Sequence, residues 1–436
     1  MTTFDQVLPI LLNIFREKSE ARLKLVPFII NRDLNGRVRL IVNEAALDTP
    51  GAASAVAELT EEMETKLGPH SFPASRAIIF EPNINSILAG NAGFPLKDIE
   101  GVTVVDRLAT EENWASIKKE SPGAPRIVFF SIKGGVGRST ALAASAWALA
   151  EQGKRVLVLD LDLESPGLST SILPDDRRPT YGIADWLVED LVLNDDTVFN
   201  DMVASSQLSH NGEIYVVPAH GRDPGEYLAK LGRVWMPKTA PDGIREPWAR
   251  RLQRLLEKLE VRWQPDVILI DSRAGIDEVG AACVTGLGAS LVLLFAIEGE
   301  QTWSGYQMLF RHWLNTGVAK DIRERLQTVG AMIPETDRVE YFDGLRERAW
   351  NIFAEELYDE VPPGEIANEN IWSFDESDES APHSPWPIQW HRGFAALRSL
   401  HSRLESIDPS EVRNIFGPFI NHLSDFVDGA GGARHE

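Results

Sequence analysis

A glycine-rich loop carries the residue types and spacing in this sequence that indicate chemistry on phosphate groups. The loop reads KGGVGRST, residues 133–140, and its glycines at 134, 135 and 137 let the backbone approach an anion closely. Successive backbone N–H groups can surround a phosphate, and a helix that starts after the loop adds partial positive charge. The hydroxyl of Ser139 stands where it can ligate Mg²⁺, which prefers oxygen ligands. The loop therefore predicts a phosphate-binding site.

A strand–loop–helix–strand unit must position this loop. An apolar run at residues 127–130 predicts a buried parallel strand before it, and an alanine-rich run at 141–151 predicts a helix after it. A second apolar strand at 156–159 ends in Asp160 and Asp162. Because α/β proteins place ligands at the carboxyl ends of parallel strands, these carboxylates are expected beside the loop.

The loop departs from the pattern G-x-x-x-x-G-K-[ST] in having Ile132 and Arg138 at the first glycine and the lysine, and it adds Lys133. In this form it resembles the deviant Walker A loop, K-G-G-x-G-K-[ST], of the ParA/MinD-like P-loop ATPases of the SIMIBI class. The resemblance continues at the DLD run of residues 160–162 and at the apolar strand that ends in Asp271. It covers roughly residues 125–365, with the motifs in the family's order.

The resemblance implies an α/β fold, a mostly parallel sheet with helices on both faces, and an ATPase that uses ATP and Mg²⁺. It implies two catalytic residues: Lys133, which in relatives crosses to the phosphates of a second subunit, and Asp162, which positions the attacking water. The residues expected to bind the nucleotide are Gly134, Gly135, Val136, Gly137, Arg138, Ser139, Thr140 and Gly275. Those expected to hold or neighbour Mg²⁺ are Ser139, Asp160 and Asp271.

Two arginines depart from the family's pattern. Arg138 keeps the positive charge of the usual lysine, but the two side chains are not interchangeable, so hydrolysis is expected to be slow. Arg273, in the run DSRAG, either reaches phosphate across a dimer or bridges to a local carboxylate.

The base of the nucleotide is left open by the sequence. Met332 and Pro334 lie where relatives often carry an adenine-reading Asn, and residues 361–364 only weakly resemble the loop beside the base. His220, in a turn after a predicted strand, is interpreted as a hydrogen-bonded loop residue rather than a catalytic base.

Composition excludes several other classes of protein. No apolar run approaches the ~18 residues of a membrane span, and the single cysteine, Cys283, permits neither an intrachain disulfide nor a metal–thiolate cluster. A cytoplasmic protein fits best.

The net charge of −22 argues against DNA binding by this chain alone, since such binding rests on the neutralisation of DNA phosphates by basic side chains. The last helix, at 410–428, lacks a basic polar face and is expected to pack on the core or on a partner rather than on a membrane.

The length of 436 residues suggests two or three domains. We expect an α+β accessory domain at 1–120, a linker at 121–125, and the ATPase domain with C-terminal helices at 126–436. The accessory domain is interpreted as a partner-binding or regulatory module, with a structural extension as the alternative. Helices are predicted in the accessory domain at 4–18, 52–67 and 111–119, and strands at 23–31, 37–42, 77–80 and 102–105. Residues 221–246 are expected to form an insertion.

The leading functional hypothesis is a switch that hydrolyses Mg-ATP and whose nucleotide-dependent homodimerisation controls an unidentified protein partner. One alternative is a nucleotide-binding scaffold with little or no turnover. Another is a metabolic amide ligase or synthetase on the same fold. Cysteine-cluster ATPases are disfavoured, because they need more than one cysteine.

Overall fold

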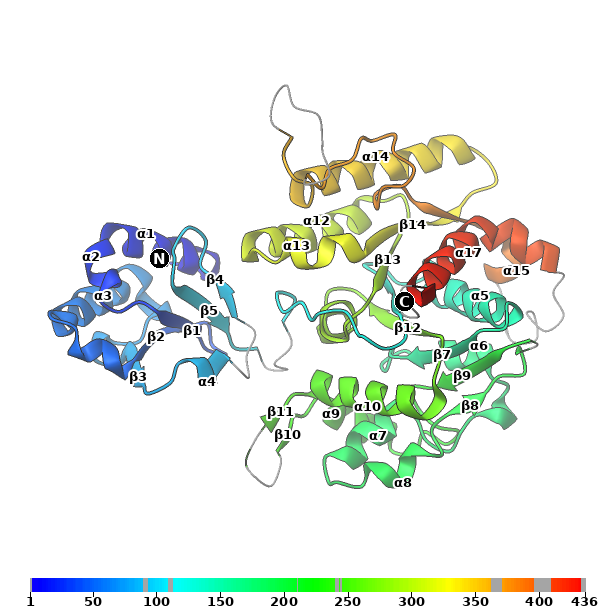
Figure 1. Ribbon diagram of the computed structural model, residues 1–436, viewed down its shortest axis with the longest axis horizontal. Coiled ribbons are helices and arrows are strands. Elements are labelled where there is room, and N and C mark those ends of the chain that lie inside the picture. The colour runs from blue at the N-terminus through cyan, green and yellow to red at the C-terminus, as the bar shows by residue number, and fades with distance from the viewer. Residues whose placement is uncertain are drawn as a thin grey trace. The chain divides into compact units, whose positions relative to one another are not determined.

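The computed structural model describes residues 2–88, 93–108, 113–209, 211–239, 243, 245–361, 371–395 and 409–432 (Figure 1). The chain forms two compact units. Residues 1–116 with 312–319 make the smaller unit, and residues 117–311 with 320–436 make the larger one.

The larger unit is built on an eight-stranded sheet with the order β15-β14-β13-β6-β12-β7-β9-β8 (Figure 1). Its strands in chain order are β6 (Arg126–Ser131), β7 (Arg155–Asp160), β8 (Ala204–Ser205), β9 (Glu213–Val217), β12 (Val267–Ala274), β13 (Leu291–Ala296), β14 (Leu326–Ile333) and β15 (Trp386–Gln389). All neighbouring strands are parallel except β8 and β9, which are antiparallel. The predicted mostly parallel α/β sheet is confirmed.

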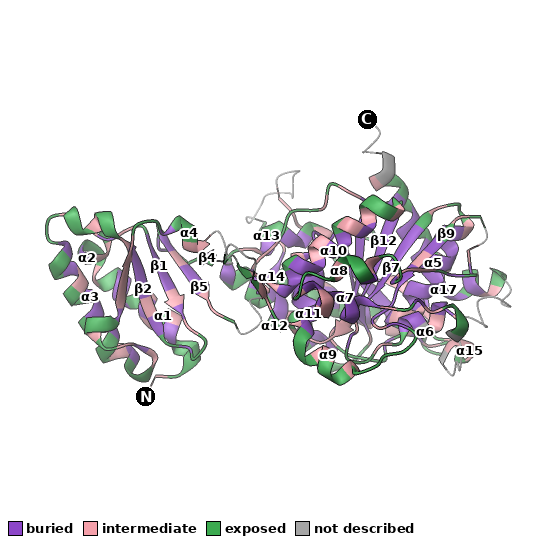
Figure 2. Ribbon diagram, turned by 90° about the horizontal axis from the view of Figure 1, so that it is seen from below, coloured by how far each residue is buried: buried purple, intermediate pink, exposed green. Residues whose placement is uncertain are grey.

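Helices cover both faces of this sheet, because successive side chains of a buried strand point to opposite faces. Phe129 contacts Phe419 of α17 (Pro409–Gly432), which lies on the same face as α5 (Arg138–Glu151). The next residue, Phe130, contacts Tyr306 of α12 (Glu300–Thr316) on the other face. Figure 2 shows the strands buried between the two helical layers.

The other helices described between β6 and the C-terminal helix α17 are α6 (Leu168–Ile172), α7 (Ile183–Asp190), α8 (Asp195–Phe199), α9 (Tyr227–Val234), α10 (Trp248–Trp263), α11 (Glu278–Ala281), α13 (Ala319–Ile322), α14 (Arg338–Glu356) and α15 (Arg392–Ala395). The predicted insertion at 221–246 contains α9 and a short ribbon of β10 (Lys238–Thr239) and β11 (Arg245–Glu246). Among the described residues, no helix combines the length and apolar character that a membrane span requires.

The smaller unit holds a five-stranded mixed sheet with the order β3-β2-β1-β5-β4. Its strands are β1 (Phe28–Arg32), β2 (Val38–Asn43), β3 (Ile78–Glu81), β4 (Gly93–Pro95) and β5 (Val102–Asp106), and its helices are α1 (Val7–Glu17), α2 (Ser19–Leu23), α3 (Ala52–Leu67) and α4 (Asn85–Leu88). Helices α1 and α3 pack on one face, where Phe15 contacts Phe28 edge-on.

One predicted element of the N-terminal region is wrong, and another begins later than predicted. Residues 113–119 of the helix predicted at 111–119 are not helical, and residues 111–112 lie outside the described residues. The Asn113 side chain accepts a hydrogen bond from the N–H of Ala115, at 2.8 Å, and this local bond competes with a helix. The strand predicted from residue 23 begins only at Phe28, because α2 extends to Leu23.

The segment predicted as a linker, residues 121–125, is hydrogen-bonded to the larger unit. The N–H of Ser121 donates to the carbonyl of Gly288 at 3.0 Å. The N–H of Ala124 donates to the Glu260 carboxylate on α10 at 2.7 Å. These bonds fix the chain where it enters β6, the strand that precedes the glycine loop.

Helix α17 packs into the core, as expected for the last helix of the chain. Phe419 is fully buried, and its ring contacts the rings of Phe129, Phe295 and Trp386. The apolar face of this helix is thus taken up by the sheet.

We predict that Phe419→Ala lowers the free energy of unfolding by about 3–5 kcal/mol, because the truncation leaves a cavity between α17 and the sheet. Urea unfolding measures the change. Val339→Ala, at a side chain 73% exposed on α14, is the control and should change stability by less than about 0.5 kcal/mol. An equally small effect of Phe419→Ala would show that α17 is not anchored on the sheet.

Candidate functional site

The register of the sheet brings the predicted carboxylates together at one edge. Strand β12 lies between β6 and β7, and Asp271 is paired with Asp160 of β7. Since these strands are parallel, their carboxyl ends meet where the loop at 133–140 leaves β6.

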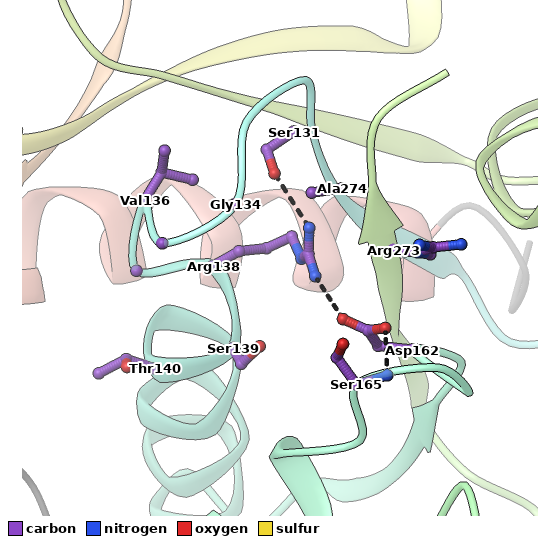
Figure 3. Close-up of a pocket in the computed structure, with 12 residues that line it drawn as sticks. Ser131, Gly134, Val136, Arg138, Ser139, Thr140, Asp162, Ser165, Arg273 and Ala274 are labelled. Atoms are coloured by element: carbon purple, nitrogen blue, oxygen red, sulfur yellow. Dashed lines mark hydrogen bonds and ion pairs between the residues drawn. The ribbon is translucent and has the colours of Figure 1, made fainter. Parts of the chain in front are cut away.

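The glycine loop is open on the side that faces this edge. Gly135 and Gly137 have φ values of 75° and 82°, a left-handed region that favours glycine. A Cβ atom added at Gly134, Gly135 or Gly137 would meet no atom within 4 Å, so the backbone of the loop is accessible. Beside it lies a cavity of about 520 Å³ that loop residues 134–140 line together with Asp162, Ser165 and Arg273 (Figure 3).

The guanidinium of Arg138 lies on the carboxylates rather than on the loop backbone. Arg138 is 8% exposed, and its Nε donates to Asp271 Oδ1 at 2.7 Å. Its Nη1 donates to the Ser131 hydroxyl at 2.9 Å, and its Nη2 lies 3.7 Å from Asp162 Oδ2 (Figure 3). The Ser139 hydroxyl donates to Asp271 Oδ2 at 2.6 Å. Both oxygens of Asp271 are therefore engaged.

Asp160 does not line the cavity, although the sequence places it next to Asp162. It is fully buried, and its Oδ2 accepts hydrogen bonds from the N–H and the hydroxyl of Ser169, at 3.2 and 2.9 Å. Oδ1 has no hydrogen-bond partner among the described residues. Burial, and then the nearby charge of Asp271, raise the pKa of Asp160 to about 7.

Asp162 lies at the cavity and is half-buried. Its Oδ1 accepts a hydrogen bond from the N–H of Ser165 at 3.1 Å. Burial raises the pKa of Asp162, while this hydrogen bond and the charge of Arg138 oppose the rise. The two aspartates of the DLD run thus have different surroundings, one inside the protein and one at the cavity.

The remaining predicted site residues are placed as follows. Lys133 is exposed at the start of the loop. Gly275 has a φ of 105°, and its N–H donates to the carbonyl of Ser131 at 2.9 Å, so in this structure it is directed toward β6. Val136 and Thr140 both line the cavity. His220 is a hydrogen-bonded turn residue, with Nδ1 2.7 Å from the Gly221 carbonyl.

Arg273 takes the second of its two predicted alternatives in this structure. Its Nη2 lies 2.7 Å from Glu164, and its Nη1 lies 3.3 Å from Asp277. Both partners are local carboxylates of the same chain.

A second pocket, of about 270 Å³, adjoins the glycine loop and was not predicted. It is lined by Gly135 and Thr140, by Met332, and by Trp390 and His391 just after β15. The sequence places Met332 near the base of the nucleotide, but it does not predict Trp390 and His391 there. The only sequence feature that marks these two residues is an aromatic pair after the four-residue strand β15, which follows an acidic loop. Residues 362–364, the other predicted neighbours of the base, lie outside the described residues.

The donor set at the loop suits Mg²⁺ held together with phosphate oxygens. No group of three or more His, Cys, Asp or Glu side chains that could hold a metal ion occurs in the part of the chain that the structure describes. Ser139 and Asp271 offer one hydroxyl and one carboxylate, which fits an ion that usually keeps several waters and binds substrate phosphates.

Residues 127–342 match the family model of the CobQ/CobB/MinD/ParA nucleotide binding domain. Among curated proteins, the chain is 27% identical over 172 residues to the septum site-determining protein MinD of Buchnera aphidicola subsp. Acyrthosiphon pisum, covering 39% of this chain and 50% of that protein. It is 33% identical over 106 residues to MinD of Escherichia coli K12, covering 24% and 36%. The chain thus spans half or less of the length of these relatives.

Among solved structures, the chain is similar to the septum site-determining protein MinD of Pyrococcus horikoshii OT3 complexed with Mg-ADP. The identity is 23% and the TM-score 0.34, over 49% of this chain and 72% of that one.

We predict that Asp160→Asn changes the pH dependence of stability in the nucleotide-free protein. Because the pKa of Asp160 is raised in the folded state to about 7, the folded state binds more protons than the unfolded chain between about pH 4 and pH 7. Its contribution to the free energy of unfolding is therefore present below about pH 4 and is lost as the pH rises through 7.

The variant lacks this loss, so its stability relative to wild type should increase from about pH 5 to about pH 8 in urea unfolding. Asp223→Asn, at an exposed loop carboxylate, should show no such trend and serves as the control. A difference between Asp160→Asn and wild type that stays constant with pH would contradict the raised pKa.

Proposed function

We propose that this chain, whose residues 127–342 match the CobQ/CobB/MinD/ParA nucleotide binding domain, is a ParA/MinD-like, Mg-ATP-hydrolysing switch whose nucleotide-dependent dimerisation controls a protein partner. One observation carries the proposal. Ser139 lines the cavity together with the open glycine loop, and its hydroxyl lies 2.6 Å from the buried Asp271 just behind it, so ligands for Mg²⁺ and donors for phosphate lie next to each other.

The backbone N–H groups of the loop would bind the phosphates of ATP. Their partial positive charges attract an anion, so no basic side chain is needed for this contact. Mg²⁺, held by Ser139 and Asp271, would neutralise charge on those phosphates. Arg138 contacts Asp271 in this structure, so the binding of Mg²⁺ to that carboxylate requires the guanidinium to leave it. A planar guanidinium can then bind two phosphate oxygens at once.

Asp162 is the proposed water-positioning residue, because its carboxylate is at the cavity and is held in place by the N–H of Ser165. Phosphoryl transfer is catalysed chiefly by positioning and charge stabilisation, which needs a fixed acceptor of this kind.

Lys133 is exposed and therefore accessible to a second subunit. Asp160 is proposed to act indirectly, since it lies inside the protein behind Asp271.

The pocket beside Trp390 and His391 is the proposed site of the base. It adjoins the loop at Gly135 and Thr140 and offers an aromatic surface with the polar side chains of Gln389 and His391. Such a pocket, apolar with a few polar groups, suits a flat purine. Adenine is the proposed base.

A nucleotide-binding scaffold with little turnover is the second candidate, and the Arg138–Asp271 pair favours it. The two side chains are 8% and 1% exposed, and a buried charge pair is costly to separate unless both partners gain new ones. Slow exchange of Arg138 would let the loop backbone bind the phosphates but would delay the approach of Mg²⁺ to Asp271, and with it hydrolysis.

A protein is the proposed partner, because a net charge of −22 opposes contact with DNA phosphates. The smaller unit, residues 1–116 with 312–319, is the proposed partner-binding module. A cytoplasmic location is proposed from the cysteine content, since one buried cysteine forms no intrachain disulfide.

We predict that Asp162→Ala lowers the rate of phosphate release from Mg-ATP by at least about 100-fold, because the attacking water loses its acceptor. ATP affinity should change little. Ser165→Ala is the matched control, since Ser165 lines the same cavity but holds Asp162 through its backbone N–H. Turnover that persists in Asp162→Ala would reject the assigned role, and absence of turnover in the wild type would favour the scaffold.

We predict that ATP with Mg²⁺ doubles the mass of the protein in solution and that Lys133→Ala weakens this dimer, because the exposed lysine reaches the phosphates of the second subunit. Light scattering after size exclusion measures the mass. Lys320→Ala, at a lysine side chain 76% exposed on α13, should dimerise like the wild type. A monomer mass for the wild type at saturating ATP would refute nucleotide-dependent dimerisation.

A further inference from the structure

An ion pair joins the loop after β7 to the last residues of strand β12 at the mouth of the phosphate cavity. Glu164 follows Asp162 by two residues, and Arg273 follows Asp271 by two residues. The Arg273 Nη2 lies 2.7 Å from Glu164 Oε2, and its Nη1 lies 3.3 Å from Asp277. The loop and the strand end therefore each carry one partner of the pair and one carboxylate of the proposed site.

Arg273 itself faces the phosphate cavity. It lines the cavity with Asp162 and Ser165. Its side chain is 34% exposed, and that of Glu164 is 45% exposed, so the pair is in contact with solvent. A solvent-exposed ion pair contributes little to stability and exchanges partners readily.

The loop that carries Asp162 is held at a second point by a neutral group. The hydroxyl of Tyr227, on α9, donates to the carbonyl of Leu163 at 2.6 Å. Leu163 and Glu164 are adjacent in the chain, so one anchor of the loop is a phenol and the next is a guanidinium. Only the charged anchor responds to the charge of a bound anion.

We propose that Arg273 senses the terminal phosphate of the bound nucleotide by exchanging Glu164 for it. This inference rests on the proposed function. In this structure Arg273 pairs with Glu164 and thereby joins the loop after β7 to the end of β12. A terminal phosphate offers more negative charge and more acceptor oxygens than one carboxylate, so the guanidinium transfers to it. The ion pair then no longer holds the loop with Asp162, whereas the hydrogen bond from Tyr227 remains.

The test compares the affinity for a non-hydrolysable ATP analogue with the affinity for ADP, both with Mg²⁺, by equilibrium titration. Arg273→Gln removes the sensor and should lower the analogue-to-ADP affinity ratio about tenfold. Glu164→Gln removes the nearer of the two carboxylates that compete for Arg273 and should raise the ratio about threefold. The double variant should resemble Arg273→Gln, because without the arginine the glutamate has nothing to compete for.

Tyr227→Phe is the matched control, because it removes the neutral anchor of the same loop without changing any charge. It should leave the analogue-to-ADP ratio unchanged. A structural ion pair with no sensing role would make Arg273→Gln and Glu164→Gln shift the ratio in the same direction, and that result would overturn the inference. So would an unchanged ratio in Arg273→Gln.

The titrations distinguish a failure of the proposed function from a failure of the proposed sensing role of Arg273. If the wild type binds neither nucleotide, the nucleotide site itself is refuted, together with everything built on it. If the wild type binds both nucleotides and the two variants do not shift the ratio in opposite directions, only the role of Arg273 falls. Thermal unfolding of each variant confirms that the exposed substitutions leave the fold intact.

Discussion

The contact between Arg138 and Asp271 is the interaction on which the rest of the site depends. Asp271 ends the apolar part of the central strand β12, and Arg138 begins the helix that follows the glycine loop, so the pair joins the loop to the sheet. Burying a carboxylate without a partner is costly, and this structure meets that constraint in two ways. The charge of Asp271 is balanced by the guanidinium of Arg138. Burial raises the pKa of Asp160, so that a proton can neutralise that carboxylate.

This arrangement makes ligand binding an exchange of cations. Arg138 and Ser139 engage the two oxygens of Asp271, so a divalent ion can use that carboxylate only when the arginine finds another anion. A nucleotide triphosphate supplies that anion. Arg273 is proposed to exchange a carboxylate for phosphate in the same way at the mouth of the cavity, where it pairs with the exposed Glu164. Arg138 and Arg273, two of the residues that depart from the expected pattern, thus line the same cavity, and both contact carboxylates.

The sequence predicted those parts of the site that local patterns determine. The glycine loop needs positive φ at Gly135 and Gly137, and the apolar runs around it form β6 and β7 because strands buried on both faces of a parallel sheet carry such runs. Contacts between distant residues were not predictable in this way. The partner of Arg138 is 133 residues away, and Trp390 reaches the loop only through the pairing of β15 with β14. The predicted helix at 111–119 failed at residues 113–119 because a side-chain hydrogen bond of Asn113 competes with helical ones.

The central claim, that Arg138 exchanges Asp271 for phosphate, is tested most directly by a crystal structure of the protein with a non-hydrolysable ATP analogue and Mg²⁺. The account predicts that the triphosphate lies on the backbone of residues 134–140, that the Arg138 guanidinium contacts phosphate oxygens, and that Asp271 and Ser139 face the ion. A nucleotide bound in the loop while Arg138 still occupies Asp271 would contradict the exchange. Nucleotide bound elsewhere on the chain would contradict the site itself.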